Sequence, residues 1–72
     1  MKTIQECLAH NLRTLRAAKE MSQSQVSEAT DIAIASIKLI ETQKRWPELE
    51  TINKLAKLYG VSSIKLFQAP KT

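Results

Sequence analysis

The 72-residue chain is long enough for one domain and too short for two independent hydrophobic cores. Its composition, 43% hydrophobic and 25% charged with a single glycine, is typical of a folded, mainly helical protein, and it excludes a disordered chain and a glycine-rich phosphate loop. The lone cysteine excludes an internal disulfide, and the formal charge of +4 permits an anionic partner such as nucleic acid.

The first predicted helix spans about residues 4–19. Thr3 and Glu6 have the spacing of a capping box, in which each side chain binds a free amide at the start of a helix. Apolar residues then recur at steps of three and four: Ile4, Leu8, Leu12 and Leu15. This spacing predicts one apolar face that packs on the core.

Two shorter helices are predicted next, over about residues 23–29 and 33–41. The segment Ser22-Gln23-Ser24-Gln25 is a second capping box, and Val26 and Ala29 are expected to point inward. Between the helices, Asp31 is suited to a tight turn because aspartate tolerates a left-handed backbone better than most residues. The two helices and their turn suggest a helix-turn-helix motif over residues 22–41.

A loop over residues 42–46 and two further helices complete the chain. Pro47 disfavours helical geometry at the preceding residue and is well suited to begin the fourth helix, which ends at Gly60 as a cap. Its predicted apolar positions are Leu49, Ile52, Leu55, Ala56 and Tyr59. Ser62 is expected to cap a last short helix that holds Leu66 and Phe67, and residues 68–72 are expected to form a frayed tail.

Several motifs fall in a familiar order: LRTLR at residues 12–16, the Ser22-Gln23 start followed by Val26, then Ile37, Glu41 and Pro47, and LAKLYGVSSIKLF at residues 55–67. In this order and spacing, the stretch 8–67 resembles the DNA-binding domain of the lambdoid phage repressor, Cro and XRE family. The resemblance implies one all-α, five-helix, lambda-repressor-like domain over residues 1–72, whose third helix enters the major groove of DNA.

The sequence departs from the family pattern at four positions. Asp31 and Gln43 stand where the family usually has glycine, and Ser27 stands where a smaller alanine is common. Ala33 replaces the polar residue that usually opens the third helix, and this loses a helix cap typically worth about 1 kcal/mol. None of these departures changes the expected fold.

The third helix has two faces. At about 100° per residue, Ala33, Ile37 and Ile40 share a narrow arc, which we expect to face the core, with Ile32 packing from the turn. The other side carries Ile34, Ala35, Lys38 and Leu39. The resemblance implies that this outer face, together with Ser36, meets the bases.

Three interpretations of the aliphatic outer face remain open. Ile34 and Leu39 could contact thymine methyl groups while Lys38 meets a guanine edge or a phosphate. The face could instead bind a protein, such as a toxin, an anti-regulator or a second copy of the chain. Finally, the aliphatic side chains could simply be exposed or covered by a neighbouring loop.

Other residues are expected to hold the DNA backbone or the fold. Gln23, at the start of the second helix, matches a family phosphate contact, and a role in the capping box is its compatible alternative. Thr42, Lys44 and Arg45 are placed to reach the same strand, although Lys44 and Arg45 could be solvated loop charges. The resemblance also implies an ion pair between Arg16 and Glu41 that bridges the first and third helices.

Chemistry of other kinds has little support in the sequence. Cys7 and His10 are too few ligands for zinc, and no cofactor or catalytic pair is expected, so we predict that the protein is not an enzyme. We predict a cytoplasmic, nucleoid-associated regulator that binds double-stranded DNA as a homodimer, without a membrane or a small-molecule effector. Because the sequence ends after the fifth helix, no separate dimerisation or effector domain is expected. The rival prediction is a helix-turn-helix module used for protein binding, as in an antitoxin or adaptor.

Overall fold

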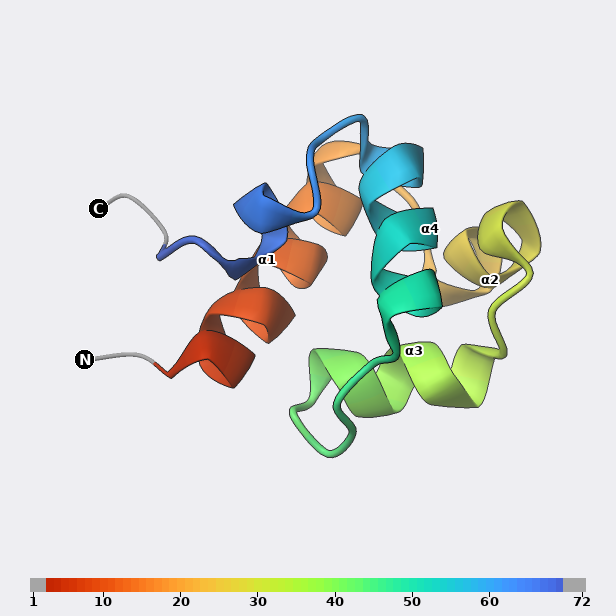
Figure 1. The fold of residues 1–72 in the computed structure, drawn as a ribbon. Helices are drawn as coiled ribbons and strands as arrows, with labels where there is room; N and C mark the ends of the chain where they lie inside the picture. Colours follow the sequence, from red (N-terminus) through yellow and green to blue (C-terminus); the bar gives the residue numbers. More distant parts are fainter. Residues whose placement is uncertain (1–2, 70–72) are drawn as a thin grey trace.

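The computed structural model describes residues 3–69, which form four α-helices and one 3-10 helix (Figure 1). In chain order they are α1 (Ile4–Ala18), α2 (Gln23–Thr30), α3 (Ile34–Glu41), α4 (Leu49–Tyr59) and η1 (Ile64–Phe67). The predicted all-α architecture is confirmed, although the last helix is a 3-10 helix. Within residues 3–69, no helix is long and apolar enough to cross a membrane. The end of the predicted frayed tail, residues 70–72, lies outside the described residues.

Both predicted capping boxes are present. The Thr3 hydroxyl accepts the Glu6 amide at 3.1 Å, and the Thr3 amide donates to the Glu6 carboxylate at 3.0 Å. The corresponding distances between Ser22 and Gln25 are 3.1 and 2.7 Å. Each box satisfies amides that a helix start would otherwise leave without partners, so the sequence places the beginnings of α1 and α2 correctly.

Left-handed residues end the helices. Asp31 and Gly60 adopt φ values of 62° and 67° at the ends of α2 and α4, as predicted. Glu20 and Gln43 also have positive φ, at 54° and 65°, although neither is glycine. After α3, the Lys44 amide donates to the carbonyl of Leu39 at 2.8 Å, a backward bond typical of a helix that ends on a left-handed residue. This bond turns the following loop back toward α3.

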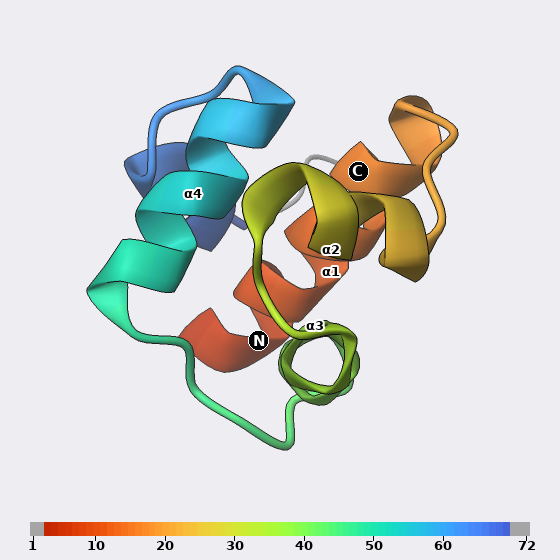
Figure 2. The same ribbon diagram turned by 90° about the vertical axis from the view of Figure 1, so that its right-hand side faces the viewer.

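The helices enclose one core. α1 packs against η1 and α3, while α2 packs against α3 and α4 (Figures 1 and 2). The core contains the following buried side chains: Leu8, Leu12, Val26, Ile32, Ile37, Ile40, Ile52, Leu55, Ala56, Tyr59 and Leu66. The predicted inward positions of Val26, Ile32, Ile37 and Ile40 are therefore confirmed. Burial of these apolar side chains supplies the main stabilisation of so small a domain.

Four apolar residues that were predicted to face the core are exposed instead. Ile4 and Leu49 are 61% and 70% exposed because each lies in the first turn of its helix, at the rim of the packed region. Ala29 is exposed because the neighbouring Thr30 takes the buried position and donates its hydroxyl to the Val26 carbonyl at 2.7 Å. Ala33 is also exposed, since it is the residue that precedes α3 rather than part of the helix.

Two predicted helix starts are wrong by one or two residues. α4 begins at Leu49 with Glu48 as its N-terminal flanking residue, so Pro47 lies before the helix, where it is buried. η1 begins at Ile64 after Ser63, one residue later than predicted, although the Ser62 hydroxyl accepts the Lys65 amide at 3.4 Å, as expected of a cap. Glu48 makes no side-chain hydrogen bond at the start of α4, so the local signal that placed α1 and α2 is missing there.

Candidate nucleic-acid interface

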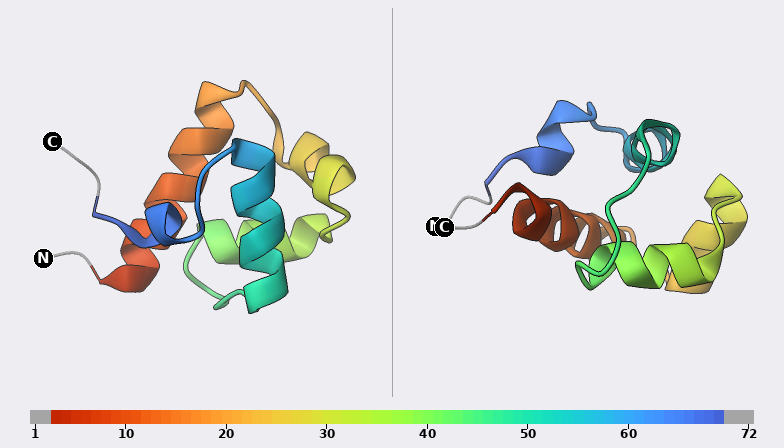
Figure 3. Two further views of the ribbon diagram at one scale, coloured as in Figure 1. Left: turned by 45° about the horizontal axis from the view of Figure 1, so that its top comes forward. Right: turned by 60° about the horizontal axis from the view of Figure 1, so that its bottom comes forward.

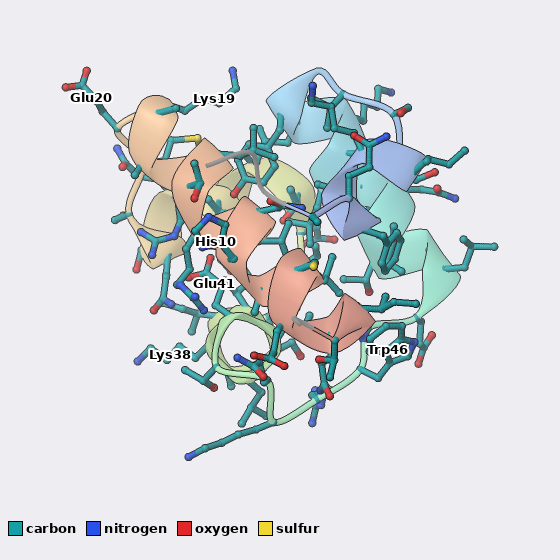
Figure 4. The ribbon with its side chains drawn as sticks, turned by 90° about the vertical axis from the view of Figure 1, so that its left-hand side faces the viewer. His10, Lys19, Glu20, Lys38, Glu41 and Trp46 are labelled. Carbon is teal, nitrogen blue, oxygen red and sulfur yellow. The ribbon has the colours of Figure 1, made fainter. Side chains whose placement is uncertain are left out.

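Helix α3 is attached to the body of the protein by one side. Ile37, Ile40 and Glu41 are at most 3% exposed and face inward, whereas Ala35 and Lys38 are exposed. The helix lies along one edge of the molecule (Figure 3), and Lys38 extends away from the body in Figure 4. The outer side of α3 is therefore available to a large ligand.

The two aliphatic residues of the outer face differ in exposure. Ile34 is 37% exposed, while Leu39 is half-buried. The carbonyl of Leu39 accepts the amides of both Lys44 and Arg45, at 2.8 and 3.2 Å, so the returning loop starts beside this residue. The expectation of an open aliphatic face thus holds for Ile34 and only in part for Leu39.

The Glu41 carboxylate joins three helices. Its oxygens accept the Arg16 Nε and Nη2 groups, each at 2.9 Å, and the Gln23 Nε2 group at 3.2 Å. The side chain of Glu41 is 4% exposed and that of Arg16 is 24% exposed. Figure 4 shows Glu41 between α3 and α1. A paired guanidinium and an amide donor compensate the loss of hydration of this buried carboxylate.

Arginine side chains complete the attachment of α3 to α1. Hydrogen bonding to Glu41 raises the pKa of Arg16, whose Nη1 group also donates to the Met21 carbonyl at 3.1 Å. Arg13 donates through Nη1 to the backbone carbonyl of Glu41, at the C-terminal end of α3. A positive charge near the last carbonyls of a helix is favourable. Arg13 therefore has a contact inside the protein.

Gln23 differs in part from its prediction. Gln25, not Gln23, is the side chain of the capping box. Gln23 is half-buried and directs its amide group to Glu41, although it stands first in α2. Its position at the start of α2 is as expected, while its hydrogen bond to α3 is a contact that the sequence did not predict.

The loop after α3 holds the remaining predicted phosphate contacts. The Thr42 hydroxyl donates to the Lys38 carbonyl at 2.7 Å, so it completes the last turn of α3. Lys44 and Arg45 are exposed, and Arg45 Nη1 donates to the Ser36 hydroxyl at 2.8 Å. The loop is also tied to α1, since Gln5 donates to the carbonyl of Gln43 at 3.0 Å. The predicted cations therefore lie beside α3, on a loop fixed at both flanks.

Ser27, one of the departures from the family pattern, has a structural role, and so does Trp46 in the loop after α3. Ser27 donates its hydroxyl to the Ile32 carbonyl, which ties α2 to the turn of the motif. Trp46 is 52% exposed and packs its ring against Phe67, with 6.0 Å between ring centroids. The tryptophan thus closes the loop onto η1 while leaving about half of its surface open.

A family model described as helix-turn-helix matches residues 12–66. The chain belongs to this family. The family predicted from the sequence is therefore confirmed, and the curated relatives that the chain matches are named HTH-type transcriptional regulators. The matched residues include all of α2, α3 and α4.

The curated relatives of the chain are transcriptional regulators. The chain is 32% identical over 60 residues to HTH-type transcriptional regulator PuuR of Escherichia coli (strain K12), and equally to PuuR of Shigella flexneri. The match covers 83% of the chain and 32% of each relative, so the chain spans about a third of the length of these curated relatives.

Two solved structures share the fold. The hypothetical transcription factor NHTF from Neisseria has a TM-score of 0.89 and 25% identity, over 94% of this chain and 78% of that one. The restriction-modification controller protein C.AhdI from Aeromonas hydrophila has a TM-score of 0.81 and 27% identity, over 88% and 96%. The five-element arrangement is therefore the family's fold.

Proposed function

We propose that the protein is a sequence-specific DNA-binding regulator that inserts α3 into the major groove. The observation that supports this most directly is the one-sided attachment of α3, whose inner face is buried while Ala35 and Lys38 face solvent. The major groove of DNA is wide enough to admit a single α-helix of this kind. The formal charge of +4 favours an anionic partner.

The outer face of α3 supplies the base contacts in this proposal. Ile34 and Ala35 offer apolar contact to thymine methyl groups, and Leu39 adds to it with the part of its side chain that is open. Lys38 reaches a guanine edge or a phosphate. Because apolar contacts discriminate less than paired hydrogen bonds, DNA shape contributes to the choice of site.

The rim of this face supplies the phosphate contacts. Gln23 stands at the start of α2, where free amides and the positive end of the helix dipole favour an anion. Thr42, Lys44 and Arg45 flank the other end of α3. Phosphate contacts position the protein on the duplex and supply most of the affinity, without reading the sequence.

A homodimer is the assembly that we propose on DNA. Two copies related by a two-fold axis place their α3 helices in successive major grooves, about 34–36 Å apart. Large apolar side chains outside the DNA face support a second protein contact: Ile4, Trp46, Leu49 and Ile64 are between 52% and 72% exposed. We place the protein in the cytoplasm with the nucleoid and propose no small-molecule effector.

Selection of binding sites from random duplexes tests the proposal. The expected result is one preferred sequence with two-fold symmetry. If the dimer neutralises about 6–8 phosphates, the logarithm of its affinity should fall with the logarithm of salt concentration at a slope of about −5 to −7. A flat salt response, or no binding to any duplex at low salt, would contradict the proposal and favour a module that binds protein instead.

A further inference from the structure

We propose that Arg45 reads a guanine base from the loop, and that Ser36 on α3 holds its guanidinium for this purpose. The proposal rests on the DNA-binding function above and changes the role of Arg45, which was expected to meet a phosphate. The geometry that carries it is the 2.8 Å hydrogen bond from Arg45 Nη1 to the Ser36 hydroxyl.

The path of the chain brings Arg45 beside the middle of α3. Gln43 adopts a left-handed conformation, and the next two amides both donate to the Leu39 carbonyl. This reversal points the chain back along the helix, so a residue four positions after the end of α3 contacts the third residue of the helix.

The contact with Ser36 leaves most of the guanidinium free. Arginine carries five N–H donors in a rigid planar group, and the hydroxyl uses one of them. Among the described residues, the structure gives the Nε and Nη2 groups of Arg45 no partner, and these two groups form one edge of the plane. Such an edge matches the O6 and N7 acceptors of guanine, a pair that arginine contacts more often than any other base feature.

Because α3 has few side chains that can pair with a base, a hydrogen-bond donor from the loop adds base recognition that the helix lacks. The outward residues of the helix are Ile34, Ala35, Lys38 and Leu39, so it carries no arginine, asparagine or glutamine that could pair with a base through two hydrogen bonds. Arg45 has the chemistry that the helix lacks. Ser36 orders its long side chain before binding, which lowers the entropy lost when the contact forms.

The test compares the protein with three single variants on the selected duplex and on duplexes with each base pair replaced in turn. For the unchanged protein, replacing one guanine in each half-site should weaken binding about 5- to 150-fold, the range for one paired contact. Arg45→Ala and Arg45→Lys should both reduce this discrimination to less than about twofold. Lysine keeps the charge but cannot pair through two donors, so it separates base reading from phosphate attraction. Lys44→Ala, the matched neighbour, should weaken binding to all duplexes by the same factor.

Other results would overturn the proposal. If Arg45→Ala weakens binding to every duplex equally, or if Arg45→Lys behaves as the unchanged protein, Arg45 contacts phosphate. A selected half-site without a required guanine would have the same meaning. If the unchanged protein binds no duplex, the DNA-binding function itself fails, and this inference fails with it.

Separate variants test whether Ser36 acts by positioning the Arg45 guanidinium. Ser36→Ala should lower the guanine discrimination, Ser36→Thr should restore it because the hydroxyl is retained, and Ser36→Ala should have no effect when Arg45 is already alanine. If the effects of the two alanine substitutions multiply instead, Ser36 contacts DNA by itself. All these variants should melt within about 2 °C of the unchanged protein, because the bond lies at the surface.

Discussion

Replacing Arg16 with alanine should destabilise the fold more than any change to the loop cations. The substitution removes the three hydrogen bonds that Arg16 donates to the Glu41 carboxylate and leaves Gln23 as its remaining donor. The Glu41 side chain is only 4% exposed in the folded protein, so loss of the guanidinium leaves its carboxylate poorly compensated. Stranding a buried charge in this way typically costs about 3–5 kcal/mol.

The expected change in melting temperature is large for a domain of this size. One kcal/mol shifts the melting temperature of a 60–100-residue domain by about 4–8 °C, so Arg16→Ala should lower it by at least about 12 °C. Circular dichroism at 222 nm measures this directly. Lys44→Ala is the matched control, because Lys44 is exposed, and it should melt within about 2 °C of the unchanged protein while binding DNA more weakly.

A double substitution separates the stranded charge from the loss of packing. When Glu41 is also replaced by alanine, the uncompensated carboxylate is gone, so Arg16→Ala with Glu41→Ala should be more stable than Arg16→Ala alone. Equal melting temperatures for Arg16→Ala and Lys44→Ala would refute the structural role of the pair. A double variant less stable than Arg16→Ala would refute the account based on a stranded charge.

Three further predictions concern single side chains. Burial raises the pKa of Tyr59 to about 12 and its hydroxyl has no hydrogen-bond partner among the described residues, so Tyr59→Phe should stabilise the fold by about 1 kcal/mol in urea unfolding. Since the pKa of Tyr59 in the folded protein lies above the ordinary value of 10, the protein should lose stability as pH rises from 10 to 12. This part of the loss should be missing in Tyr59→Phe. Equal losses of stability in the two proteins would contradict the burial argument. Gln43→Gly should raise stability by about 0.5–1 kcal/mol, because glycine adopts the left-handed conformation without strain, and a lower melting temperature would show that the glutamine side chain stabilises the loop. Leu49→Glu should convert the proposed dimer to a monomer in sedimentation experiments without altering the helical content, and an unchanged mass would remove Leu49 from the interface.

The sequence predicted the helix starts that depend only on residues close together in the chain. The capping boxes at Thr3 and Ser22 depend only on residues three positions apart, so the sequence contains all the information that they need. Asp31 and Gly60 likewise end their helices through their own backbone preferences. Where no side chain caps the helix, at Glu48, the predicted start was wrong.

Periodicity did not predict the solvent exposure of side chains that depends on where each helix overlaps its neighbours. Periodicity gives the direction in which a residue points, but not whether another element covers it. Ile4 and Leu49 have the correct spacing and are exposed because they lie in the first turns of α1 and α4. Glu41 is the opposite case: it is a charged residue that is buried because Arg16 from α1 pairs with it, and the family resemblance rather than periodicity predicted this pair.

The faces of α3 followed from the sequence and the Arg16–Glu41 pair from the family resemblance, while the other internal connections of the candidate interface did not. The inward position of Ile37 and the outward position of Lys38 follow from helical geometry alone. The contact from Arg45 to Ser36 depends on a chain reversal that only the tertiary structure reveals. The reversal takes place at Gln43, and because this left-handed residue is not a glycine, the sequence gives little indication of it.

The anchoring of α3 separates the evolution of specificity from that of stability. Ile37, Ile40 and Glu41 fix the helix from behind, so under the proposed function substitutions at Ala35 and Lys38 should alter which operator is chosen, with little penalty to folding. A duplicated copy could acquire a new target through a few surface changes. The same property makes the domain a convenient scaffold for transplanting the reading residues of another regulator.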